Sequence, residues 1–142
     1  MDRNIIYILG ILESIEKIFI YANGFLNAES LLESNDQKEF NAIYNLLLFI
    51  SETVKNKINP KLLNQFKTIP WNEIKGFRNR LAHEYSDIDP EILFDIVTVN
   101  LPQLKNAFIA MLKTLEIEKT SFLLALNSKY YSHLSYLETE LF

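Results

Sequence analysis

The sequence predicts an all-α fold, a bundle of four to five helices with an additional C-terminal helix. Three observations support this prediction. Hydrophobic residues recur at helical spacing, glycine and proline number only 3 and 4, and strand-like alternation is found nowhere convincingly. With 142 residues, of which 49% are hydrophobic and 23% charged, the chain has the size and composition of one globular domain.

Two apolar stripes with three- and four-residue spacing predict two long amphipathic helices. The first helix ends near Asn23-Gly24, and the polar stretch Ser34-Asn35-Asp36 leads into the second. Short helical turns are expected within 27–33 and 60–66. The stripes consist of Ile5, Ile8, Leu12, Ile15 and Phe19, and of Phe40, Ile43, Leu47, Ile50 and Val54.

Prolines mark the later helix starts, because proline is tolerated in a first helical turn. A third helix is predicted from Pro70 to about Tyr85, and a fourth from Pro90, with Asp89 as its cap. The fourth helix continues past Pro102, where we expect it to be kinked or divided. A last stripe predicts one C-terminal helix and consists of Tyr130, Leu134, Leu137 and Leu141.

These elements divide the chain into a bundle domain over residues 1–116 and a C-terminal extension over 117–142, which packs on the bundle or on a partner. The absence of cysteine removes disulfides, thiolate catalysis and cysteine zinc sites, and two histidines leave little for a metal site. We therefore expect no metal and no cofactor. No apolar run approaches the roughly 18 residues that span a bilayer, and residues 1–4 lack a signal-peptide layout, so we expect a cytoplasmic protein.

Charge is unevenly distributed along the chain. The formal net charge is −4, yet the segment 55–80 carries +6 and the remainder −10. A basic segment in an acidic chain favours a polyanion site, whereas the alternative is a solvated helix face with counter-charges elsewhere in the fold. Its charged residues are Lys55, Lys57, Lys61, Lys67, Glu73, Lys75, Arg78 and Arg80.

The segment 69–85 concentrates the polar groups that phosphodiester chemistry requires. Arg78 can contact a phosphate in bidentate fashion, His83 can accept and donate protons near neutral pH, and Asn79 can orient either partner. On one regular helix Arg78 and His83 point roughly 140° apart. They converge if the helix loosens before His83 or if a two-fold dimer shares the cleft, and we favour the dimer.

The same segment also allows an interpretation without chemistry. In that case Ile74, Phe77 and Leu81 form a core face, His83 interacts with the helix dipole, and the arginines are surface charges. Elsewhere, Trp71 is expected to pack in preference to stacking on a base. The remaining polar candidates are expected on solvated or exposed helix faces: Glu13, Glu16, Glu116, Glu118 and His133.

The run over residues 70–89, with Leu-Pro-Gln-Leu at 101–104, resembles the HepT-like branch of the HEPN superfamily, whose signature is Arg-x4-His-x-Tyr. The likeness covers residues 3 to about 115 in helix layout and is specific between 70 and 104. One departure is Ser51, in Ile-Ser-Glu-Thr at 50–53, where the family often has Ile-Gly-Glu-Ala. The region after about residue 117 has no counterpart.

This resemblance implies a metal-independent endoribonuclease, the toxin of a type VII toxin–antitoxin system, acting as a homodimer with its cleft at the subunit interface. Arg78 and His83 are then catalytic, with Asn79 as polar helper. A minimal nucleotidyltransferase (MntA-like) antitoxin is implied to transfer AMP to Tyr85, and this partner also allows hetero-oligomers above a dimer. The RNA-binding candidates are Arg80, Lys75 and Lys67.

The chemistry follows from the substrate as well, because RNA carries its own nucleophile, the 2′-OH. A cleaving site then needs only proton transfer and charge stabilisation. Two alternative functions remain open. One is a non-catalytic nucleotide- or substrate-binding subunit of a nucleotidyltransferase, and the other is a helical interaction module without chemistry. A titrating histidine near an arginine favours the ribonuclease over both.

Overall fold

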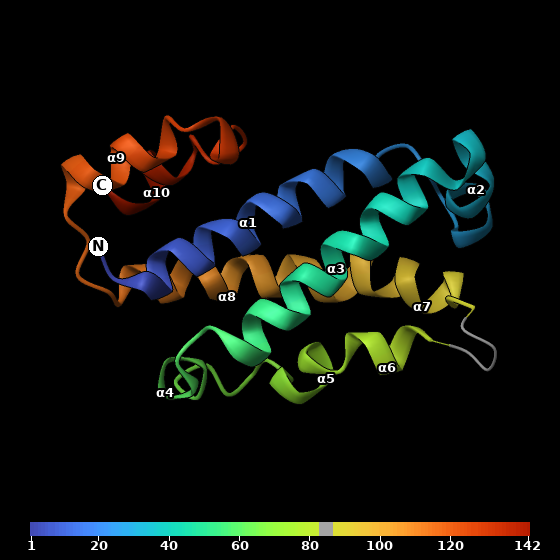
Figure 1. Cartoon of the computed structure of the whole chain (residues 1–142), viewed down its shortest axis with the longest axis horizontal. Coiled ribbons are helices and arrows are strands. Elements are labelled where there is room, and N and C mark those ends of the chain that lie inside the picture. Colours follow the sequence, from blue (N-terminus) through green and yellow to red (C-terminus); the bar gives the residue numbers. More distant parts are fainter. Residues whose placement is uncertain (83–86) are drawn as a thin grey trace.

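A computed structural model describes residues 1–82 and 87–142 of the protein, and these residues are mostly helical (Figure 1). Within them we find no β-strand beyond one isolated bridge between Ala82 and Ile88, which confirms the predicted all-α bundle. No helix in the described ranges combines the length and apolar character needed to cross a membrane. The elements are α1 (Arg3–Ala22), α2 (Ala28–Glu33), η1 (Ser34–Gln37), α3 (Lys38–Asn56), α4 (Pro60–Leu63), α5 (Trp71–Lys75), α6 (Phe77–Leu81), α7 (Pro90–Asp95), η3 (Ile96–Asn100), α8 (Leu101–Lys113), α9 (Lys119–Leu126), η4 (Lys129–Tyr131) and α10 (Leu137–Leu141).

Helix α1 is the central helix of the bundle. It packs along α3 and α8 and also contacts the C-terminal segment at η4. A helix with neighbours on several sides must be apolar around most of its circumference. Helix α1 meets this requirement. Both predicted stripes are confirmed, with Phe19 half-buried and Phe40 3% exposed. The fully buried side chains of α1 are Ile5, Ile8, Leu9, Ile11, Leu12, Ile15 and Ile18.

The connection from α2 to α3 reverses the chain through three consecutive left-handed residues. Asn35, Asp36 and Gln37 have φ angles of 48°, 56° and 65°. Asparagine and aspartate tolerate this region better than most residues, which explains the polar stretch. Helix α3 begins after Gln37, whose side chain makes no capping hydrogen bond. The polar residues therefore form the turn and do not cap α3.

The predicted third helix is wrong in its length, because the chain forms two short helices in its place. Gly76 separates α5 from α6, and its N–H donates to the carbonyls of Asn72 and Glu73 at 3.1 and 3.2 Å. A Cβ at Gly76 would lie 3.3 Å from the Asn72 oxygen, so glycine permits this tight closure. Helix α6 then ends at Leu81, and Ala82 is extended with ψ 132°.

The fourth helix is continuous from α7 to α8 through a π-helical turn, η3. Asp89 caps its start as predicted, with its carboxylate accepting from the N–H groups of Glu91 and Ile92. At the other end of η3 the Leu101 N–H donates to the Ile96 carbonyl, five residues back. Pro102 has no N–H to donate and its ring crowds the carbonyl four residues earlier. A wider turn immediately before Pro102 accommodates it.

The C-terminal segment packs on the bundle, over α1 and α8 (Figure 1). The predicted single helix is replaced by a 3₁₀ turn, η4, and the short helix α10. Leu134 and Leu137 of the predicted stripe are fully buried, whereas Tyr130 is 81% exposed. Phe122 of α9 is also fully buried. These apolar side chains join the same core as α1, and the division at residue 116 stays a prediction.

The expectation of solvated faces is wrong for Glu13 and Glu16. Glu13 is 4% exposed, and its carboxylate lies 2.5 Å from Nδ1 of His133 and accepts the His133 backbone N–H at 3.2 Å. Glu16 pairs with Lys105 at 2.6 Å. Burial, followed by the Glu16 charge, raises the pKa of the neighbouring Tyr136. The C-terminal segment and α8 supply the partners of these carboxylates.

Candidate active site

Helix α6 presents Arg78 and Asn79 to solvent. Its opposite face is the predicted core face, where Ile74 of α5 is 2% exposed and Phe77 and Leu81 are fully buried. Both polar side chains are exposed, and Arg78 has no ion pair with a carboxylate in the described part of the chain. The guanidinium of Arg78 is therefore available to an anionic ligand.

The end of α6 changes the geometry of the motif. After Leu81 the chain leaves the helix, Ala82 forms the bridge with Ile88, and the Asp89 N–H donates to the Leu81 carbonyl at 2.9 Å. The helix thus stops before His83, which is one of the two arrangements considered for the motif. His83 and Tyr85 themselves lie outside the described residues, so their positions relative to Arg78 stay predictions.

Arg80 lies in a different environment from Arg78. It is half-buried, and its Nη1 donates to Oδ1 of Asn100 at 3.4 Å while Nη2 lies 3.8 Å from Oδ2 of Asp95. Arg80 therefore links α6 to α7 and η3. The other two RNA-binding candidates differ from it, because Lys67 is exposed, Lys75 is half-buried, and neither has an ion pair within residues 1–82 and 87–142.

Ser51 supports the site from α3. Its side chain is buried, and Oγ donates to the main-chain carbonyl of Lys75 at 3.0 Å. The last carbonyls of a helix lack intrahelical partners, so this hydrogen bond satisfies the end of α5 next to the break at Gly76. Sequence reasoning missed this role. The signal was the departure from the family's Ile-Gly-Glu-Ala at this position.

Trp71 packs in the core, as predicted. It is 9% exposed, its indole Nε1 donates to the carbonyls of Leu63 and Phe66 at 2.8 and 3.1 Å, and its ring meets Phe108 edge-on at 5.7 Å. The indole therefore fixes α4 and the following turn against the start of α5. Its N–H is occupied, and its ring is buried except where it lines a hollow at the start of α5.

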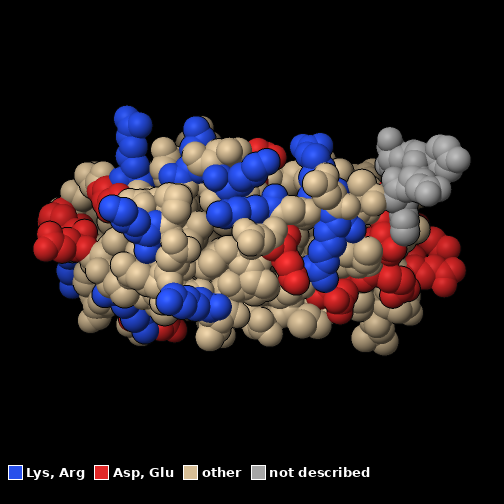
Figure 2. All heavy atoms as spheres, turned by 90° about the horizontal axis from the view of Figure 1, so that it is seen from below, with Lys and Arg blue, Asp and Glu red and all other residues tan. Residues whose placement is uncertain are grey.

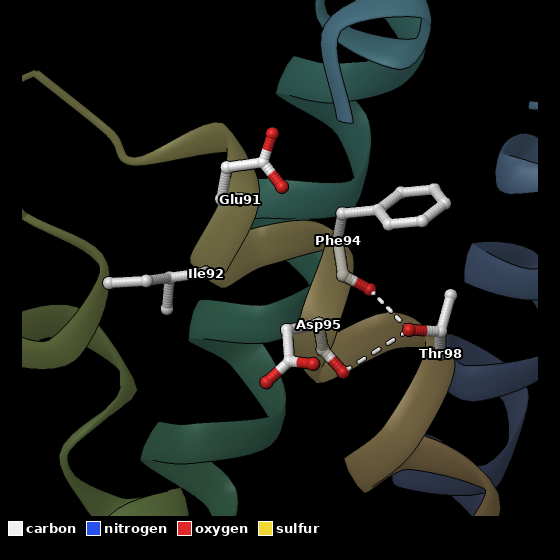
Figure 3. A pocket seen from close by; sticks show the side chains of 5 residues that line it. All are labelled: Glu91, Ile92, Phe94, Asp95 and Thr98. Carbon is white, nitrogen blue, oxygen red and sulfur yellow. Dashed lines mark hydrogen bonds between the residues drawn. The ribbon is translucent and has the colours of Figure 1, made fainter. Parts of the chain in front are cut away.

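A hollow of about 550 Å³ lies along α7 and η3 (Figure 3). Glu91 and Asp95 give it an acidic lining, which disfavours a phosphate. The Thr98 hydroxyl donates to the carbonyls of Phe94 and Asp95 at 2.9 and 3.5 Å, so it is not free for a ligand. Among the described residues we find no group of three or more metal-ligating side chains.

Comparisons with known proteins define the class of this chain as ribonuclease. The model of the family described as Ribonuclease HepT-like matches residues 11–111. A "Probable ribonuclease HepT" of Thermococcus cleftensis is 31% identical over 106 residues, covering 72% of this chain and 89% of that protein. A "Putative RNase" of Methanocaldococcus jannaschii is 31% identical over 96 residues, covering 68% and 76%. No solved structure matches.

The chain belongs to the HepT-like ribonuclease family. This membership confirms the resemblance carried by residues 70–104 and the prediction of an endoribonuclease. The family match ends at residue 111, so α9, η4 and α10 lie beyond it.

Proposed function

We propose that the protein cleaves RNA without a metal ion, using Arg78, Asn79 and His83. The observation that carries this proposal is the exposure of Arg78 and Asn79 on a helix that ends two residues before His83. The core face of the same helix is fully buried, so the polar side chains are not required for packing. An exposed guanidinium suits a bound phosphodiester, because it can donate two parallel hydrogen bonds to the phosphate oxygens.

The proposed step is attack of the 2′-oxygen on the adjacent phosphorus. His83 takes the 2′-OH proton, the P–O5′ bond breaks, and the leaving 5′-oxygen receives a proton from a second acid, for which the partner subunit of a homodimer is a candidate. Arg78 donates to the non-bridging oxygens as their charge develops. Asn79 orients His83 or the phosphate. The products are a 2′,3′-cyclic phosphate and a free 5′-hydroxyl.

The test is cleavage of one end-labelled RNA in EDTA, beside a DNA of the same sequence. We expect RNA to be cut to a 2′,3′-cyclic phosphate and DNA to remain intact. Arg78→Ala should lower kcat by about 10²-fold or more, the loss typical of a missing charge-stabilising donor. His83→Ala should remove activity, whereas Asn106→Ala, an exposed change on α8, should not. Activity that is lost in EDTA and restored by a divalent ion would contradict the proposal.

The wider role that we propose is the toxin of a type VII toxin–antitoxin pair. Its partner is a minimal nucleotidyltransferase that transfers AMP to Tyr85, two residues from His83 in the sequence. A nucleotide there adds bulk and negative charge where the RNA phosphate must bind. The family membership and the Arg-x4-His-x-Tyr motif support this role. Lys67 and Lys75 are proposed to contact RNA beside the motif.

A further inference from the structure

A row of exposed lysines lies before α5 in the chain, outside the motif. Lys55 is in the last turn of α3, Lys57 follows that helix, and Lys61 is in α4, and all three are exposed. Helices α4, α5 and α6 lie at the lower edge of Figure 1, and the view from below shows many Lys and Arg side chains over this face (Figure 2). Much of the basic segment of the sequence therefore lies on one side of the molecule, where Lys and Arg side chains outnumber acidic ones.

The lysines of this row differ from the paired cations of the protein. Lys105 pairs with Glu16, Lys113 with Glu140 and Arg80 with Asp95. Over residues 1–82 and 87–142, by contrast, none of the ion pairs involves a lysine of the row. Like charges that gather without counter-charges repel one another and favour a bound polyanion. Lys55, Lys57 and Lys61 therefore do not follow the alternative in which carboxylates elsewhere in the fold neutralise the basic segment.

The backbone under the lysines is held by specific hydrogen bonds. Asn59 caps α4 by accepting from the Lys61 N–H at 2.9 Å, and its own N–H donates to Oδ1 of Asn4 at 3.0 Å. The Trp71 indole holds the end of α4 and the next turn through its two carbonyl contacts. These contacts fix the positions from which the lysines extend, so binding a ligand requires little ordering of the main chain.

A hollow of about 440 Å³ lies at the start of α5, where the Trp71 indole joins this helix to the end of α4. Lys67 and Asn72 give it a cation and an exposed amide, while Pro70 and Trp71 provide apolar walls. Glu73 is the one carboxylate in its lining. A sugar and base can enter such a hollow while their flanking phosphates lie on the lysines.

The chemistry of the face favours RNA over an acidic protein. Protein interfaces usually have an apolar centre surrounded by polar groups. The large exposed apolar side chains found in the described residues all lie outside the segment 50–98. They are Met1, Ile6, Ile20, Leu26, Phe49, Val99, Leu124, Tyr130 and Phe142.

We propose that Lys55, Lys57 and Lys61, with the hollow at Trp71, form an exosite for the RNA strand, distinct from the position of the cleaved bond. The exosite binds phosphates through the lysines and one nucleoside in the hollow. This inference rests on the proposed function, because it assigns the same RNA substrate a second contact. It implies that affinity depends on substrate length and on salt.

The test compares two variants with equal loss of charge. The exosite variant is Lys55→Gln/Lys57→Gln/Lys61→Gln, and the control is Lys38→Gln/Lys119→Gln/Lys129→Gln, whose lysines are exposed elsewhere. Binding of a single-stranded 20-mer RNA is measured over a salt series, and cleavage is measured on the 20-mer and on a dinucleotide. Three lost phosphate contacts should reduce the slope of log K against log salt by about 2.

We expect the control variant to keep the wild-type salt slope. The exosite variant should lose more than about tenfold in kcat/KM on the 20-mer relative to the dinucleotide, because only the longer RNA places phosphates on the exosite lysines. An unchanged slope, or an equal loss in the control, would overturn the exosite. So would displacement of the 20-mer by polyglutamate at equal charge concentration, which would assign the face to an acidic protein. If the wild type and the exosite variant show the predicted difference in salt slope but the wild type cleaves no RNA, the exosite stands and the proposed function fails.

Discussion

Ala82 pairs with Ile88 in an isolated antiparallel bridge, directly after α6 has ended at Leu81. The regular helix that would separate Arg78 from His83 by roughly 140° therefore does not reach His83. The same break separates Arg78 from Tyr85 in the sequence. Convergence of Arg78 and His83 within one chain is compatible with this arrangement. The divergence of Arg78 and His83 on a regular helix is therefore no longer an argument for the homodimer.

We still expect a homodimer with a shared cleft, since a second proton donor is required for the leaving oxygen. Light scattering should give about twice the chain mass of 16.6 kDa. If each cleft takes Arg78 from one chain and His83 from the other, a mixture of Arg78→Ala and His83→Ala chains should regain activity, because one of its two clefts then contains both intact side chains. A fully active monomer would contradict the shared cleft. A dimer whose mixture stays inactive would contradict this division of Arg78 and His83 between the two chains.

Arg80 should act by holding α6, in contrast to the RNA contact expected from its charge. Its contacts with Asp95 and Asn100 join α6 to the helix that follows the motif. We expect Arg80→Gln and Asp95→Asn to lower kcat by similar factors, with little change in KM. If Arg80 contacts RNA, Asp95→Asn frees a cation and should instead lower KM. Steady-state kinetics on one RNA distinguishes the two roles.

Tyr85 should be the residue that the antitoxin modifies. Incubation with the partner nucleotidyltransferase and ATP should add the mass of AMP to wild type but not to Tyr85→Phe, because the variant lacks the acceptor oxygen. The variant should fold and escape silencing. Intact-mass analysis gives the answer, and an exposed tyrosine at a distance, Tyr130, provides the control as Tyr130→Phe. Equal addition to wild type and Tyr85→Phe would place the modification on another residue.

The contact between Glu13 and His133 should stabilise the fold. His133→Ala leaves the buried carboxylate of Glu13 without its ring partner, and we expect a loss of about 1–3 kcal/mol in the free energy of unfolding. Ser135→Ala, an exposed change two residues away, should have little effect. A double-mutant cycle with Glu13→Gln isolates the pair, measured by denaturant unfolding. Additive effects would show that the two side chains are not coupled.

The sequence predicted most reliably the features that depend on local spacing. The stripes of α1 and α3 and the exposure of Arg78 opposite Phe77 and Leu81 follow from helical periodicity. The cap Asp89 follows from the local start signal Asp89-Pro90. These features need no knowledge of distant residues. Helical spacing alone is therefore enough to assign the candidate side chains of α6 to its solvent face.

The features that the sequence did not predict depend on contacts between distant segments. Alanine is a good helix former, yet Ala82 is extended and forms a bridge with Ile88. The burial of Glu13 depends on His133, 120 residues further along the chain. Helical periodicity carries no information about such partners, since it describes one element at a time.

Trp71 is the single tryptophan of the chain, and it lies where α4, α5 and α8 meet. Its fluorescence therefore reports on the half of the bundle that carries the motif and the basic face. Circular dichroism, by contrast, averages over all helices, including α9 and α10. Unfolding curves from the two signals should coincide if the C-terminal segment melts with the bundle. An earlier transition in circular dichroism alone would show that this segment detaches while the ribonuclease half stays folded.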